Sequence, residues 1–165
     1  MKTSFSNYIE QLQDRITNRL EQLDGGATFQ EDLWEREEGG GGRTRVIENG
    51  NVFEKGGVNI SKVHGELPPS MQTYFGVKDS TFFACGLSLV LHPKNPMVPT
   101  VHANWRYFEL YDMKGAKIDA WFGGGQDLTP YYLFEEDALH FHTVCKRACD
   151  AHEGDFYKTF KEKCD

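Results

Sequence analysis

The sequence lacks the features that mark several large classes of protein. No apolar run approaches the roughly 20 residues that span a bilayer, and the first residues contain no apolar block typical of a signal peptide. Basic residues are outnumbered by acidic ones, 18 to 25, and the net charge of −7 argues against a nucleic-acid-binding surface. The four cysteines contain no CxxC pair, so free thiols are expected rather than disulfides. These absences predict a cytoplasmic protein without a membrane span.

The composition is otherwise that of an ordinary globular protein, except for its aromatic residues. The 165 residues are enough for one domain, expected over residues 1–165, and too few for two. Hydrophobic residues make up 39% and charged residues 26% of the chain. The aromatic share of 13% favours packed sheets or a broad flat ligand over a helical bundle.

The spacing of apolar residues predicts an α+β fold. Apolar residues recur at three- and four-residue steps from Ile9 to Leu23, which predicts a helix with Asn7 near its start and Gly25-Gly26 as its stop. The later elements are strands at 28–34, 58–63, 81–92, 100–111 and 118–122, a hairpin at 44–55, a loop at 66–80, and helices around 139–149 and from 156. Asn49-Gly50 favours a tight type I′ turn in the hairpin. This order indicates a mostly antiparallel sheet flanked by helices.

Two adjacent predicted strands carry polar side chains with the same parity. His102, Asn104 and Arg106 project from one face of their strand, because side chains two residues apart point the same way. Ser88 and His92 share a parity on the preceding strand. A hairpin that pairs His92 with His102 would place Ser88 opposite Arg106. The alternate residues of the second strand are largely apolar and are expected to pack against helices: Val101, Ala103, Trp105 and Tyr107.

A face of this composition suits a ligand that carries carboxylates. Arg106 offers a planar two-pronged donor, Asn104 and Ser88 offer further donors, and a histidine can move protons near neutral pH. A polar sheet face that simply meets water fits the same pattern. From the residues alone we therefore predict an anion-binding, proton-transferring site without naming its substrate.

A metal site is an alternative use of the histidines. His92 and His102, with His140 or His142 as a third ligand, have a spacing compatible with a divalent ion, although it is not a specific metal motif. His142 also shares a helix face with Cys145 and its neighbours, and burial is the commoner explanation of such a face.

Two glycine runs could approach a ligand closely. Gly39–Gly42, followed by Arg43, could cradle an anion with backbone N–H groups. Gly123–Gly125 could bend around a ligand and present Asp127. Either run could equally be a flexible loop, and neither has the P-loop pattern of nucleotide-binding proteins.

Four segments together resemble the oxygen-dependent coproporphyrinogen III oxidase family. They occur in the order of the family and are Gly39–Arg45, Phe53–Asn59, His102–Arg106 and Trp121–Pro130. The departures are small: the family often has Val where Trp105 stands and Phe where Gln126 stands. Members are about twice as long as this chain, so the resemblance implies the N-terminal portion of such a domain.

The resemblance implies an enzyme of heme biosynthesis. The propionates on rings A and B of coproporphyrinogen III become vinyl groups, giving protoporphyrinogen IX, with O2 as the oxidant and CO2 and H2O2 released. It also implies a flat antiparallel sheet flanked by helices, a homodimer, and a macrocycle bound against the sheet. No obligatory cofactor is expected, because the electron-rich pyrrole can itself reduce oxygen.

The resemblance also implies roles for individual residues. His102 matches the proton donor of the family, and Asp127 matches an acidic residue that engages the pyrrole N–H groups. The positions that match substrate contacts are Ser88, Asn104, Trp105 and Arg106. The positions that match divalent-metal ligands are His92, His102 and His142.

Two other readings remain open at the level of sequence. A metal-dependent β-barrel of cupin type is suggested by the proline-rich loop between His92 and His102. A chain that binds porphyrinogen or a partner protein without turnover is the second.

Overall fold

The described residues in the middle of the chain form six strands, each antiparallel to the one before it. In the computed structural model, which describes residues 1–152 and 155–164, the strands are β1 (Gln30–Glu35), β2 (Gly40–Glu48), β3 (Phe53–Glu66), β4 (Thr81–Pro93), β5 (Thr100–Tyr111) and β6 (Lys117–Thr129). Their order in the sheet is β1-β2-β3-β4-β5-β6. The predicted α+β fold with an antiparallel sheet is confirmed. Within the described residues the sheet is open and β1 does not pair with β6, so the cupin-like barrel reading is wrong.

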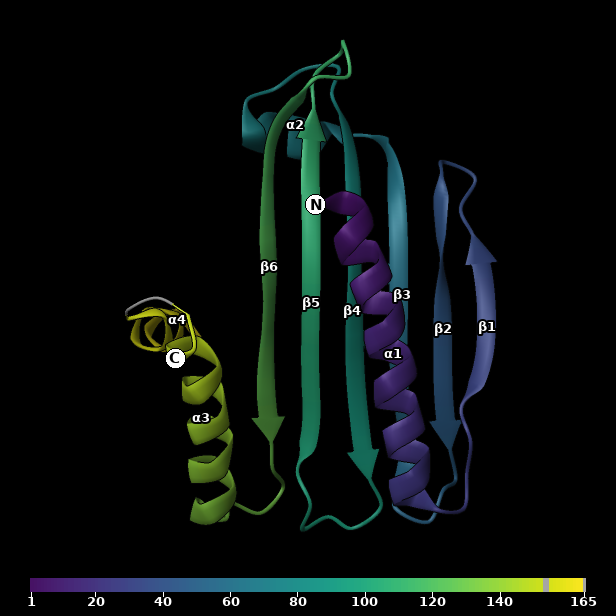
Figure 1. Ribbon diagram of the computed structural model, residues 1–165, viewed down its shortest axis with the longest axis vertical. Coiled ribbons are helices and arrows are strands. Elements are labelled where there is room, and N and C mark those ends of the chain that lie inside the picture. The colour runs from purple at the N-terminus through teal and green to yellow at the C-terminus, as the bar shows by residue number, and fades with distance from the viewer. Residues whose placement is uncertain (153–154, 165) are drawn as a thin grey trace.

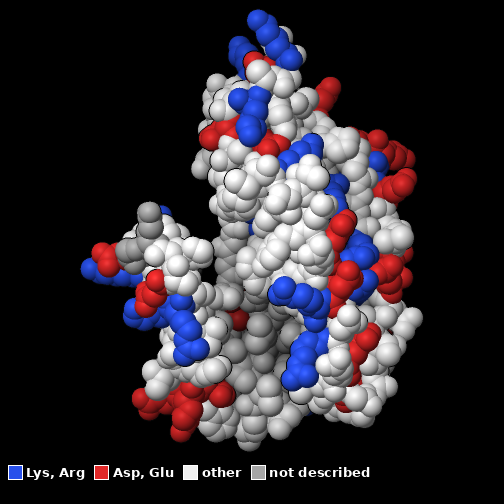
Figure 2. Space-filling model, viewed as in Figure 1, with Lys and Arg blue, Asp and Glu red and all other residues white. Residues whose placement is uncertain are grey.

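The described residues also form four helices, which are distributed unevenly about the sheet (Figure 1). They are α1 (Lys2–Asp24), α2 (Pro69–Phe75), α3 (Glu135–Asp150) and α4 (Phe156–Cys164). Helix α1 lies along one face, α2 lies at one end, and α3 and α4 lie beside the edge strand β6. In the space-filling view a hollow separates α3 and α4 from the body that carries α1 (Figure 2). None of the helices in the described part of the chain is both long enough and apolar enough to cross a membrane.

The hydrophobic core lies between α1 and the sheet. Ile9 and Leu12 of α1 pack with Val58 of β3 and Leu87 of β4, and all four side chains are buried. Full burial of one such side chain contributes about 1.5–3 kcal/mol. The helix begins earlier than predicted, at Lys2 rather than near Asn7, and ends as predicted at Gly25, whose left-handed φ of 65° suits glycine.

Buried polar groups at this interface are hydrogen-bonded. The Gln13 Nε2 donates to the carbonyls of Arg43 (2.9 Å) and Val58 (2.7 Å), and the Arg43 Nε donates to Gln13 Oε1 (2.5 Å). On the same face, Tyr107 donates to the buried Glu109 carboxylate at 2.6 Å. That bond is the main reason that the pKa of Tyr107 rises to about 12. The Gln13 bonds join helix and sheet, the Tyr107 bond lies within β5, and each of these buried groups has a partner.

The turn between β2 and β3 is organised by a residue from α1. The Asp24 carboxylate accepts backbone N–H bonds from Asn51, Val52 and Phe53, each at 2.9–3.0 Å. The bond from Phe53 is the largest influence that lowers the Asp24 pKa, and together these bonds outweigh the opposing effect of burial. Four residues, 49–52, connect β2 and β3, and among them only Asn49 has a positive φ. A type I′ turn needs a positive φ at both central residues, so the predicted two-residue turn is wrong.

Three other predicted boundaries differ from the structure. The predicted strand at 58–63 is the middle of β3, which continues back into the hairpin arm at Phe53. The predicted loop at 66–80 contains α2, which has Pro69 in its first turn, a position that proline favours. The predicted strand at 118–122 is longer, because β6 runs on through the second glycine run to Thr129.

Candidate ligand-binding face

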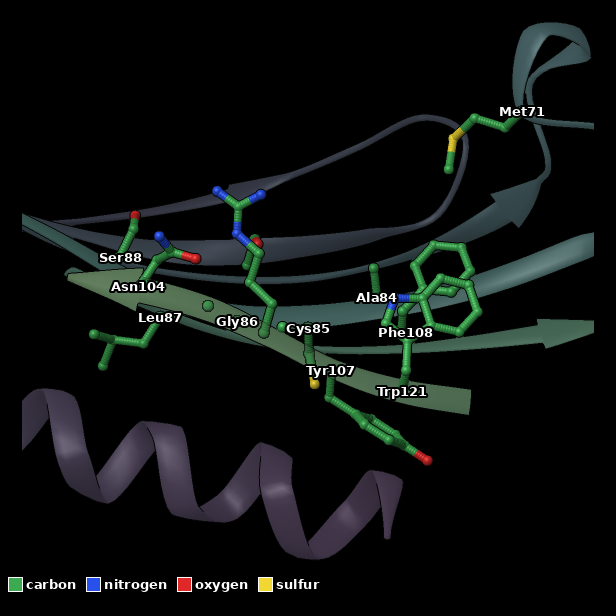
Figure 3. A pocket seen from close by; sticks show the side chains of 15 residues that line it. Met71, Ala84, Cys85, Gly86, Leu87, Ser88, Asn104, Tyr107, Phe108 and Trp121 are labelled. Carbon is green, nitrogen blue, oxygen red and sulfur yellow. The ribbon is translucent and has the colours of Figure 1, made fainter. Parts of the chain in front are cut away.

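The polar residues predicted on β4 and β5 do share one face, the one opposite α1. Figure 3 shows Ser88 and Asn104 pointing away from α1, while Leu87 and Tyr107 point toward it. Ser88 pairs with Asn104, and Gly86 pairs with Arg106. His102 pairs with Val90 rather than with His92, so the expected register is wrong by two residues. A shift of two preserves the side-chain face, which is why the shared surface is confirmed.

This face holds a cavity of about 770 Å³. Glycines on two strands line its base, Gly86 on β4 and Gly123 and Gly125 on β6, on either side of the β5 residues Asn104 and Arg106. An apolar wall closes one end and consists of Met71, Ala84, Phe108 and Trp121 (Figure 3). Ligand sites in proteins are typically about 300–1,000 Å³. The cavity therefore has the size of a small-molecule site.

Four polar side chains on the cavity have no hydrogen bond or ion pair with another described residue. They are Ser61, Ser88, Asn104 and Arg106. Arg45 on the opposite face differs from Arg106, because it forms ion pairs with Asp14 and Glu31 at 2.8 Å each. Basic and acidic side chains lie intermixed on that opposite side (Figure 2). The unpartnered set can therefore accept a carboxylate-bearing ligand without breaking internal bonds.

A histidine–carboxylate pair lies on the same face. The His102 Nδ1 and the Asp127 Oδ1 are 2.8 Å apart, and the Thr129 hydroxyl donates to the same oxygen at 2.9 Å. His102 and Asp127 are directly opposite in the β5–β6 register. Burial raises the pKa of Asp127, but the bonds from His102 and Thr129 together outweigh it, so the pKa is lowered. A carboxylate on Nδ1 leaves Nε2 as the ring atom that can exchange a proton with a ligand.

Comparison with known proteins identifies the family. Residues 4–165 match the family described as coproporphyrinogen III oxidase. The chain belongs to this family. It is 48% identical over 177 aligned positions to coproporphyrinogen-III oxidase 1, chloroplastic, of Arabidopsis thaliana, which covers 100% of this chain and 45% of that protein. It is 55% identical over 156 positions to the oxygen-dependent coproporphyrinogen-III oxidase of Prochlorococcus marinus (strain MIT 9313), covering 93% and 43%.

A third relative has a similar identity and a similar coverage. The oxygen-dependent coproporphyrinogen-III oxidase, chloroplastic, of Glycine max is 49% identical over 175 positions, covering 100% of this chain and 46% of that protein. The chain therefore spans less than half the length of these curated relatives.

One expected substrate contact of the coproporphyrinogen oxidase family lies away from the cavity. Trp105 packs against the hydrophobic core on the α1 side, because it alternates with Asn104 and Arg106 along β5. Its side chain is not among those that line the cavity. Ser88, Asn104 and Arg106 are brought together, and Trp105 supports them from behind.

Sequence reasoning missed several cavity residues. Ser61 lies on β3, and the alternation of that strand could have shown that it shares the face of Ser88. Phe108 continues the parity of Arg106 along β5. Met71 had no such signal, since the helix that carries it was predicted to be a loop.

The first glycine run, Gly39–Gly42, does not form a loop that cradles an anion. Gly40–Gly42 belongs to β2, and Arg43 beside it binds Gln13, the Glu10 carbonyl and Asp14 at α1. A Cβ on Gly42 would lie 2.3 Å from the Trp34 ring, so the glycine serves close packing. The second run, in β6, is the one that lines the cavity.

The three expected metal ligands are not gathered at one point. The rings of His92 and His102 are 6.4 Å apart between centroids, whereas His142 lies on α3 and its Nδ1 is 3.1 Å from the Tyr157 hydroxyl. Among residues 1–152 and 155–164, no three His, Cys, Asp or Glu side chains form a group that could hold a metal ion. In this structure His92, His102 and His142 do not form a three-ligand group, so the metal assignment rests on the resemblance alone.

Proposed function

We propose that this chain carries the substrate-binding face of an oxygen-dependent coproporphyrinogen III oxidase. The observation that supports this most is the set of unpartnered side chains beside the glycines of the cavity, with Arg106 and Asn104 on one strand and Ser88 on the next. The glycines let a flat macrocycle approach the neighbouring strands closely, and the donors suit its propionates. The relatives that the chain matches are named for this reaction.

The proposed reaction is an oxidative decarboxylation repeated on two propionates. Each –CH2CH2COOH group and one O2 give –CH=CH2, CO2 and H2O2, so the substrate supplies two electrons per step to oxygen. Arg106 and Asn104 orient the carboxylate. His102 exchanges a proton through Nε2 while Asp127 holds Nδ1. The second oxygen of Asp127 then remains able to accept a pyrrole N–H.

The proposal includes three further expectations of the resemblance. They are a homodimer, O2 as co-substrate without an obligatory cofactor, and a cytoplasmic location. The chloroplastic names of two relatives describe those proteins. Iron or flavin bound stoichiometrically, with all turnover lost on its removal, would contradict the second expectation.

The test assays coproporphyrinogen III turnover by porphyrin fluorescence. It compares this chain with a protein in which the chain is continued to the length of its relatives, here called the extended protein. We expect turnover by the extended protein, with Arg106→Ala weakening substrate binding more than His102→Ala does. Binding of the substrate with no turnover in the extended protein would support the non-catalytic reading instead, and absence of both would refute the proposal.

A further inference from the structure

A third strand presents an unused polar side chain on the same face of the sheet. Asn59 lies on β3, directly beside Ser88 in the register and two residues from Ser61, which lines the cavity. It closes the segment Phe53–Asn59, one of the four segments that carry the family resemblance, and the site described above gives it no role.

The Asn59 carboxamide has no hydrogen-bond partner among the described residues. Its Oδ1 is the only buried side-chain N or O atom among them without a partner. The Nδ2 has no hydrogen bond either and is not buried, so it is the accessible end of the group. The carboxamide lies beside Gly57, where a Cβ would be 3.5 Å from Nδ2.

Stability does not explain an amide at this position. A buried acceptor without a partner destabilises the folded chain, and an apolar side chain of the same size would remove that cost. Val58 and Ile60, its neighbours along β3, are both buried apolar residues that pack toward α1. A polar group that has no partner within the described residues calls for a partner outside them.

We propose that Asn59 is a further substrate-binding residue, whose Nδ2 donates to a carboxylate of the ligand on the β3 side of the cavity. Ser61 supports it with a hydroxyl from the same strand. Neighbouring strands are about 4.8 Å apart, so Asn59 and Asn104, two strands apart, are separated by about 10 Å. A ligand that meets both must be broad and carry carboxylates on more than one side. The inference rests on the proposed function for its ligand class.

The experiment measures binding without turnover. The probe is coproporphyrin III, the flat tetracarboxylate that corresponds to the oxidised substrate, titrated into the extended protein while its fluorescence is followed. The variants are Asn59→Asp, Asn59→Leu and Ser61→Ala. Asn18→Asp is the matched control, because it makes the same change of charge at an exposed position on α1, across the sheet from the cavity.

The expected pattern is specific to a carboxylate contact. Asn59→Leu weakens binding by about tenfold, the effect of one lost hydrogen bond to a charged group. Asn59→Asp weakens it further, since two carboxylates repel, and Asn18→Asp leaves it unchanged. Thermal unfolding of Asn59→Leu should occur at or above the wild-type temperature, which a purely structural role would not give.

Several results would contradict the role of Asn59. Binding by Asn59→Asp and Asn59→Leu within twofold of wild type would overturn the inference and leave the proposed function intact. Tighter binding by Asn59→Asp would mean that Asn59 faces a pyrrole N–H, which also overturns it. If Asn59→Asp does not fold, Ser61→Ala decides, with unchanged binding counting against the β3 contact. A wild-type protein that does not bind coproporphyrin III would refute the proposed function itself.

Discussion

On the α1 side of the sheet, Gln13 and Asp24 each bind several backbone groups, whereas on the other side the side chains of Asn104 and Arg106 make no hydrogen bond or ion pair with another described residue. The same strands supply both faces, since side chains alternate along them. Side chains that hydrogen-bond to one another stabilise the fold, and polar side chains without a partner in the described chain are available to a ligand. The two faces therefore separate residues that stabilise the fold from residues available to a ligand, and paired substitutions can test this division.

The largest expected effect is on stability and comes from the α1 side. Leu87 is buried in the core, and its neighbour Val90 on the other face is about one-third exposed. We expect Leu87→Ala to lower the free energy of unfolding by about 3 kcal/mol and Val90→Ala by less than about 1 kcal/mol. Denaturant unfolding of both variants checks this. Equal losses would mean that the two faces are equally packed.

The second pair of substitutions compares an arginine expected to bind the ligand with an arginine expected to stabilise the fold. Arg106→Ala should weaken coproporphyrin III binding by about 100-fold, because a bidentate carboxylate pair is lost, and should leave stability unchanged. Arg43→Ala should lower stability by about 1–2 kcal/mol through its lost bonds to Gln13 and Asp14, with binding by the folded fraction unchanged. Fluorescence titration and chemical unfolding of both variants separate these outcomes. The same profile for both would contradict the division.

The glycine run of β6 offers a finer test within three residues. A Cβ on Gly124 would lie 2.4 Å from the Asn104 carbonyl oxygen, whereas one on Gly123 would meet nothing within 4 Å. Gly124→Ala should therefore lower stability by about 2 kcal/mol. Gly123→Ala should fold normally and weaken ligand binding by a few-fold, since its methyl group enters the base of the cavity. Thermal melting and titration of the two variants provide the check.

The smallest expected effect is a loss of folding stability in acid, which does not reach neutral pH. The pKa of Asp24 is lowered in the folded chain from its ordinary value of 3.8, so its bonds stabilise the fold fully above that value. This contribution is lost as the pH falls below about 4 toward the folded pKa. Wild type should lose stability there more steeply than Asp24→Asn, whose amide cannot titrate. Parallel slopes of unfolding free energy against pH would contradict the role of Asp24.

Strand parity could be predicted from the sequence, and strand register could not. The period of two along β5 places His102, Asn104 and Arg106 together whatever the partner strand does. The register with β4 depends on the connection from Pro93 to Thr100, whose irregular geometry no short pattern specifies. The result was the right face with a pairing wrong by two residues.

Long-range contacts explain the remaining errors. The β2–β3 turn is set by Asp24, whose carboxylate lies 25 residues earlier in the chain than Asn49 and binds N–H groups that the local sequence leaves open. Helix α2 is two turns long and is held by the rings of Phe75, Phe108 and Trp121. Neither contact appears in local periodicity. The unpartnered state of Asn59 likewise becomes visible only once its neighbours are placed.

The most direct test of the central claim asks which face of the sheet meets the ligand. Trp121 lines the cavity, and Trp105 packs on the α1 side, so their indole N–H resonances report on opposite faces. Coproporphyrin III is added to the ¹⁵N-labelled extended protein, and Trp121→Phe and Trp105→Phe assign the two signals. We expect a large shift of the Trp121 signal from the porphyrin ring current and little change at Trp105. A shift at Trp105 with Trp121 unmoved would contradict it.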